Sequence, residues 1–81
     1  MKIEIITPDK KIFAGDIKSV RVPGEKGSFQ VLKDHAPIIS TLEGGIVYIV
    51  DLDGKEIQYV ISGGVVEVKT NQIILLADSV K

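Results

Sequence analysis

The sequence predicts an all-β fold, a sandwich or barrel of short strands. Turn-forming pairs recur along the chain, and only about five to eight residues separate one from the next. The segments between them are rich in valine, isoleucine and aromatic residues, which favour strands. Helical periodicity is absent over any useful length. Since 81 residues suit one small domain, we expect a single domain over residues 1–81.

Three segments alternate apolar and polar residues, as strands with one buried face do. In Lys2–Ile5 the two isoleucines share the inward face. In Ser19–Val22 the two valines point inward, and Ser19 and Arg21 point outward. Val66–Lys69 repeats this pattern with two inward valines. The pair Asp53-Gly54 lies between two apolar segments and predicts a β-hairpin with a type I′ turn.

Three other segments carry apolar residues on both faces: Ile46–Val50, Ile57–Ile61 and Ile73–Ala77. One explanation is that strands of a small sandwich cross a corner and bury both faces. The other is an outer apolar surface that a second chain covers, because contiguous exposed apolar patches usually mark interaction sites. The pattern leaves both explanations open.

Composition excludes several classes of function. The net charge is -1, there is no basic run, and the only aromatic residues are two tyrosines and two phenylalanines, so a nucleic-acid binder is not expected. The N-terminus is too short and too alternating for a signal peptide. No apolar stretch is long enough to span a membrane. Without cysteine the chain can form neither a disulfide nor a thiolate metal site.

His35 is the only histidine, and no catalytic partner for it is apparent. Its neighbour Asp34 is too close in sequence to orient it as in a catalytic triad, and no serine lies in a nucleophile elbow. The segment Asp51–Gly54 resembles the start of a calcium loop but lacks its later ligands, and Gly24–Ser28 lacks the ending of a P-loop. We therefore assign no catalytic, cofactor-binding or metal-binding residue and expect no cofactor.

Three motifs together resemble one known family. They are VPGEKGSFQVLKDHAPIISTLEGG, YVISGGVVEVKTNQIILLAD and FAGDIKSVRVPGEKG, and they cover essentially the whole chain. The Asp-His-Ala-Pro and Ser-Gly-Gly elements occur in the order and spacing of the epsilon subunit of F-type ATP synthases. The resemblance implies the N-terminal domain of that subunit, a flattened β-sandwich of about ten short strands.

The resemblance also implies a role as a non-catalytic rotor subunit. Such a subunit binds the gamma subunit and the c-ring in the central stalk, and it couples proton-driven rotation to ATP synthesis. It is peripheral, at the cytoplasmic face of a bacterial inner membrane, and it meets the membrane only through the complex. The alternatives are an unrelated β-sandwich interaction domain and a small enzyme built around His35.

In the family, two loops face the ring and the foot of gamma. The matching positions here are Glu25, Lys26, Gly27, Ser28, Asp34 and His35. Ser28 stands where members often have an acidic residue, so Glu25 or Asp34 would replace that charge, or the contact would be a hydrogen bond.

The resemblance also gives the segments with two apolar faces a candidate partner. Outward residues among them would contribute to a gamma-facing apolar surface, and the candidates are Val47, Ile49, Val60, Ile74 and Leu76.

Family members commonly continue into two C-terminal helices that can inhibit ATP hydrolysis. This chain stops at Lys81, so no inhibitory or nucleotide-binding role is assigned. The initial Met favours a naturally short protein, and a cut chain is the alternative.

Overall fold

The computed structural model describes all residues from 1 to 81, which form eight β-strands and no helix. The strands are β1 (Lys2–Ile6), β2 (Lys11–Val22), β3 (Phe29–Leu32), β4 (Ile38–Leu42), β5 (Gly45–Asp51), β6 (Glu56–Ile61), β7 (Gly64–Lys69) and β8 (Gln72–Ala77). The all-β class predicted from the sequence is confirmed. A helix long and apolar enough to cross a membrane is not found.

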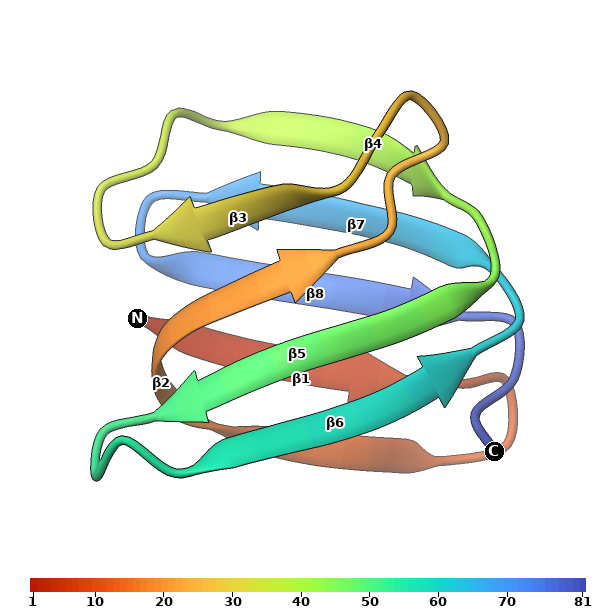
Figure 1. Ribbon diagram of the computed structural model, residues 1–81, viewed down its shortest axis with the longest axis horizontal. Coiled ribbons are helices and arrows are strands. Elements are labelled where there is room, and N and C mark those ends of the chain that lie inside the picture. Colours follow the sequence, from red (N-terminus) through yellow and green to blue (C-terminus); the bar gives the residue numbers. More distant parts are fainter.

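The strands form one continuous sheet that curls into two layers (Figure 1). Their order is β4-β7-β8-β1-β2-β5-β6, and β3 pairs with β2 beside this path. All neighbours are antiparallel except β1 and β8, which are parallel. In Figure 1, β3, β5 and β6 lie in front, and β1, β7 and β8 lie behind.

The long strand β2 joins the two layers. Its first half pairs with β1, and its second half pairs with β5 on one side and β3 on the other. The β2–β5 register shifts between Ile17 and Ser19, where β2 passes from one set of partners to the other. Such irregularities increase strand twist locally, which suits a strand that turns between layers.

Fifteen buried apolar residues form the core between the layers. The inward residues predicted from the alternating segments, two isoleucines in β1 and two valines each in β2 and β7, all belong to it. Burying such a side chain contributes about 1.5–3 kcal/mol relative to leaving it exposed. Ser19 does face outward with Arg21, but it is only 8% exposed because Leu32 and Val50 flank it on the neighbouring strands.

The predicted β5–β6 hairpin is present, but its turn type differs from the prediction. A type I′ turn needs positive φ at both central residues, and here only Gly54 has it, at 84°. The Gly54 amide donates to the Asp51 carbonyl, and the Asp51 amide donates to the Lys55 carbonyl, which makes a three-residue loop. The Asp51 carboxylate also accepts hydrogen bonds from the Asp53 and Lys55 amides. This extra support favours the longer loop.

There are fewer strands than the resemblance implied. Two short segments pair through a single bridge each, Gly24 with Leu42 and Ile61 with Val80. Each segment exchanges only two backbone hydrogen bonds with its neighbour, which is too few for a strand.

Candidate interaction surface

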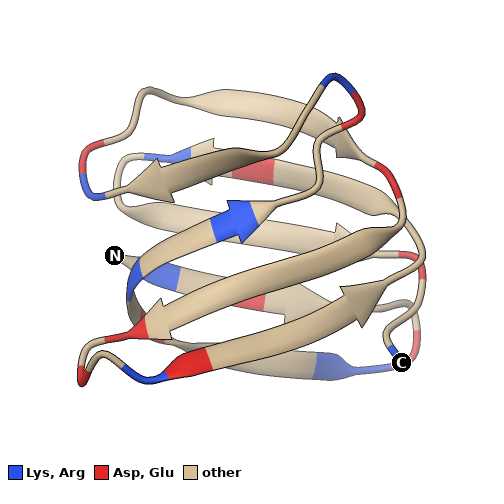
Figure 2. Cartoon of the chain, viewed as in Figure 1, with Lys and Arg blue, Asp and Glu red and all other residues tan.

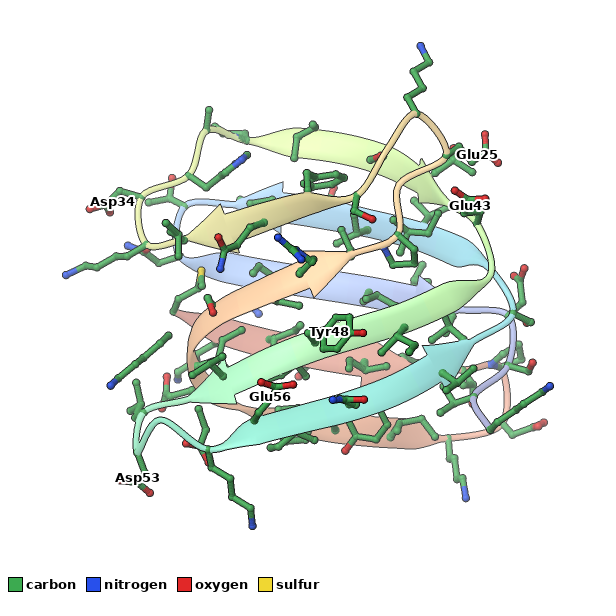
Figure 3. The ribbon with its side chains drawn as sticks, in the orientation of Figure 1. Glu25, Asp34, Glu43, Tyr48, Asp53 and Glu56 are labelled. Atoms are coloured by element: carbon green, nitrogen blue, oxygen red, sulfur yellow. The ribbon has the colours of Figure 1, made fainter.

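The loop residues predicted as contacts lie in two separate turns. Glu25, Lys26, Gly27 and Ser28 belong to the β2–β3 loop, and Asp34 and His35 belong to the β3–β4 loop. The two loops are at opposite ends of β3, along the same upper edge of the molecule, as the labelled Glu25 and Asp34 show in Figure 3. Only Glu25 shares a turn with Ser28, so Asp34 cannot replace an acidic contact at that position.

The β2–β3 loop is a tight turn with its charged side chains at the corners. The Gly27 amide donates to the Gly24 carbonyl over 3.0 Å, and the Glu25 amide donates to Thr41 of β4 over 3.1 Å. A side chain on Gly24 would meet the Gly27 carbonyl oxygen at 2.7 Å, so this close approach requires glycine. Glu25 and Lys26 are therefore held outward and exposed by an anchored backbone.

The β3–β4 loop places His35 after a second turn. The His35 amide donates to the Leu32 carbonyl over 3.1 Å, and Asp34 at the third position has φ 64°, in the left-handed region. The ring Nδ1 of His35 lies 2.6 Å from the carbonyl oxygen of Ala36. His35 is half-buried in this arrangement.

Asn71, in the β7–β8 turn, also contacts this loop. The Asp34 amide donates to Asn71 Oδ1 over 3.1 Å, and Asn71 Nδ2 donates to Asp34 Oδ1 over 3.3 Å. Nothing in the local sequence indicates this contact, because the two residues are 37 positions apart.

A groove of about 460 Å³ runs between the β2–β3 loop and the edge strand β4. Ile38 and Ile39 of β4 line it together with Phe29, and Ile39 is 70% exposed. These isoleucines were not among the predicted contact residues. The signal for them was present, since two adjacent isoleucines in a strand must point to opposite faces.

The structure corrects the predicted apolar surface at two of its five positions. Val47 and Ile49 are fully buried in the core, so they cannot belong to an outer surface. Val60 and Leu76 are exposed, at 41% and 51%, and Ile74 is partly exposed. When both faces of a strand are apolar, the period of two cannot tell which one points inward.

The three outward residues do not form one surface. Val60 lies on the outside of the layer formed by β3, β2, β5 and β6, whereas Ile74 and Leu76 lie on the outside of the opposite layer. Strand pairing sets Leu76 between Val65 and Ile6 and sets Ile74 between Glu67 and Glu4. We call Ile6, Val65, Ile74 and Leu76 the outer apolar patch. Ile6 and Val65 were not predicted, because each adjoins an alternating segment, Lys2–Ile5 or Val66–Lys69, and not one of the segments with two apolar faces.

The face around Val60 is more polar. Its only apolar cross-strand neighbour is Ile46, and the next pairs along β5 and β6 are Tyr48 with Gln58 and Val50 with Glu56. Tyr48 and Glu56 are labelled on this face in Figure 3.

Charges of both signs are scattered over the strands and loops without a large region of either sign (Figure 2). No group of three or more His, Cys, Asp or Glu side chains is placed to hold a metal ion. The His35 ring has no hydrogen bond to a hydroxyl or carboxylate, since its one partner is Ala36 of its own loop. The exposed features of the molecule are thus its polar loops and the outer apolar patch.

Comparison with known proteins identifies relatives along the whole chain. Residues 1–81 match the family described as ATP synthase, Delta/Epsilon chain, beta-sandwich domain. The ATP synthase epsilon chain of a Nitratiruptor species is 46% identical over 96% of this chain and 60% of that protein. The ATP synthase epsilon chain of Chlorobaculum tepidum is 45% identical over 96% of this chain and 89% of that protein. The chain thus spans only part of the first relative's length.

Two solved structures share the fold. A chain of Euglena gracilis mitochondrial ATP synthase, from a structure described as OSCP/F1/c-ring, superposes with a TM-score of 0.92 at 25% identity, over 98% of this chain and 51% of its own length. A chain from the central stalk/c-ring structure of the Tetrahymena thermophila mitochondrial ATP synthase gives a TM-score of 0.83 at 14% identity, over 99% of this chain and 64% of its own.

Proposed function

Since this chain belongs to the β-sandwich family of ATP synthase delta and epsilon chains, we propose that it is a non-catalytic central-stalk subunit that binds gamma and the c-ring. It couples proton-driven rotation of the ring to ATP synthesis. It works as a peripheral subunit at the cytoplasmic face of a bacterial inner membrane and reaches the membrane only through the complex. The observation that carries the proposal is the family match over all 81 residues.

The two loops along the β3–β4 edge are the proposed contacts with the ring and the foot of gamma. Glu25, Lys26 and Ser28 offer charged and hydroxyl groups on a turn whose backbone is tied to β4. Asp34 and His35 offer a second polar contact at the other end of β3. Two separated anchor points resist rotation about either one, which suits a subunit that must turn with its partners.

The outer apolar patch is the proposed gamma-facing surface. Its four residues come from three adjacent strands, and β7 pairs directly with β4, whose edge bears the groove. Apolar patches rimmed by charged groups are typical of interaction sites, and here Glu4 and Glu67 flank Ile74. We therefore assign Ile74 and Leu76 to the gamma interface and leave Val60 outside it, because one flat partner surface cannot cover both layers.

Transmission of torque requires stiffness, and this fold supplies it. Interiors packed to crystal-like density have low compressibility and transmit strain. The core is one cluster that fills the space between both layers, and every strand pairs with at least one neighbour. A force applied at the loops thus reaches the patch without a hinge between them.

Co-purification tests this proposal. The tagged chain is incubated with detergent-solubilised ATP synthase stripped of its own epsilon subunit, and the recovered subunits are identified by mass spectrometry. We expect gamma and the c-ring to be recovered together with the chain. Recovery of neither subunit, with a folded chain verified by circular dichroism, would contradict the proposal and favour an interaction domain unrelated to the synthase.

A further inference from the structure

Asn71 holds the β3–β4 loop from a distant part of the chain. Its side chain both accepts from the Asp34 amide and donates to the Asp34 carboxylate, at 3.1 and 3.3 Å. In Figure 1 the β3–β4 loop and the β7–β8 turn lie at the same end of the molecule. A pair of bonds in opposite directions fixes both the separation and the orientation of the two turns, which a single bond would not do.

Asn71 is itself firmly placed. Its carbonyl accepts a hydrogen bond from the Lys2 amide of β1 over 3.0 Å, and the flanking residues Lys69 and Gln72 are paired in the β7–β8 ladder. Asn71 and Asp34 have φ values of 55° and 64°, a region that Asn and Asp tolerate better than most residues. The side chain of Asn71 therefore extends from the rigid sheet to the loop.

The loop has no other such attachment. The remaining hydrogen bonds of residues 33–37 are local, from the His35 amide to Leu32 and between the His35 ring and Ala36. The two bonds to Asn71 are the only ones that join this segment to a distant part of the chain. Without them the turn would keep its internal bonds but would lose its defined position against the sheet.

We propose that Asn71 is a positioning residue that presets the Asp34–His35 loop in the conformation that docks against the central stalk. The inference rests on the proposed function, which makes this loop a contact with gamma and the c-ring. A loop that is already in its docking conformation binds more tightly, because the apparent affinity decreases when a smaller fraction of molecules is in the binding-competent state.

The test uses a reciprocal exchange of the two side chains. In N71D a carboxylate replaces the amide, so the Nδ2 donor is lost and two carboxylates face each other. In D34N/N71D the side-chain amide of Asn at position 34 can donate to the carboxylate of Asp at position 71. The backbone amide of residue 34 still donates as before. N71G removes the side chain but keeps the left-handed backbone of the β7–β8 turn.

Two measurements are made on the full chain and each variant. The first is hydrogen exchange of the Asp34 amide in the free chain, and the second is affinity for a purified gamma–c-ring assembly. We expect N71D and N71G to exchange this amide faster and to bind about threefold to tenfold more weakly, as loss of hydrogen bonds of this kind implies. In the D34N/N71D variant the protection of the residue-34 amide should return to within about twofold of that in the original chain. Affinity is compared only for N71D and N71G, because Asp34 is itself a proposed contact. Thermal midpoints should stay close together, which separates loop positioning from general instability.

The outcomes distinguish the two proposals. If the original chain binds the gamma–c-ring assembly and N71D and N71G bind it with the same affinity, the positioning role alone is overturned. Failure of D34N/N71D to restore the protection of the residue-34 amide that N71D loses also overturns it. Absence of binding by the folded original chain overturns the proposed function and the positioning role together.

Discussion

His35 is oriented by its own loop. Because the Ala36 carbonyl can only accept a hydrogen bond, the Nδ1 atom 2.6 Å away must carry the proton and donate. In the neutral ring this places the proton on Nδ1 and leaves Nε2 as an acceptor. A half-buried imidazole with a fixed orientation and no nucleophile beside it suits recognition better than catalysis.

The His35→Ala variant should bind the gamma–c-ring assembly more weakly by about 1 kcal/mol, or roughly fivefold, as expected for a contact that is not a hot spot. Its unfolding free energy should change little, because the imidazole bonds only within its own loop. Isothermal titration calorimetry measures the first effect and urea titration the second. Lys33→Ala, in the same exposed loop, is the matched control. Equal affinities for both variants would argue against His35 as a contact.

Gly64 illustrates a second property of single residues, the space available to them. It begins β7 opposite Ala77 of β8, and a Cβ built on it would overlap the carbonyl oxygen of Leu76. The nearby strand cannot move aside without breaking its pairing with β1. The second glycine of the Ser-Gly-Gly element is thus required by backbone packing.

The Gly64→Ala variant should lower the free energy of unfolding by about 2–3 kcal/mol, as overpacking against backbone typically does. Gly15→Ala is the control, since a Cβ there meets only the Phe13 ring at 3.5 Å, an ordinary contact. Urea unfolding of both variants measures the difference. A Gly64→Ala variant as stable as Gly15→Ala would refute the steric argument.

At the scale of elements, the apolar faces of β6 and β8 have different surroundings. Leu76 of β8 lies between apolar neighbours in the outer apolar patch, whereas Val60 of β6 adjoins a face with Gln58, Glu56 and Arg21. The two residues have similar exposure, so they make a matched pair for testing which layer faces gamma.

Leu76→Asp should weaken gamma binding by tenfold or more, about 1.4 kcal/mol, because a carboxylate in an apolar contact must lose its hydration. Val60→Asp should alter the affinity by less than about twofold, since rim and non-interface positions contribute little. Surface plasmon resonance with immobilised gamma gives both values. The reverse pattern would assign the interface to the β5–β6 layer.

Most of the elements could be predicted from the sequence because alternation and turn residues act locally. The pairs Val20/Val22 and Val66/Val68 indicated both strand and inward face correctly. The hairpin at Asp53-Gly54 was predicted correctly, but its loop length was not, because the Asp51 carboxylate bonds that favour it are specific to the folded turn. The candidate loops remain predictions as contacts.

At the scale of the whole molecule, the chain is small and has no covalent cross-link. A domain of this size has roughly 0.05–0.15 kcal/mol of stability per residue. The exposed part of its outer apolar patch contributes no burial free energy while it faces water. Binding that covers the patch would therefore stabilise the whole fold by linkage, since a partner that binds only the folded state shifts the unfolding equilibrium.

Thermal unfolding of the chain with and without gamma measures this linkage. At a gamma concentration about 100 times the dissociation constant, the folded state should gain about 2.7 kcal/mol. For a domain of this size that gain raises the unfolding midpoint by about 10 °C or more. The Leu76→Asp variant should show a smaller shift at the same concentration. An unchanged midpoint for the original chain would contradict binding to the folded state.

The sequence by itself determined the all-β class, the approximate positions of the strands, the absence of a basic face and the inward residues of the alternating strands. Each of these depends on residues close together in the chain, which the strand period of two and the turn preferences describe. Only the tertiary structure decided that Val47 and Ile49 face the core, that Val60 and Leu76 lie on opposite layers and that Asn71 holds the Asp34 loop. These depend on the curling of the sheet at β2 and on contacts between distant segments, which no local pattern encodes.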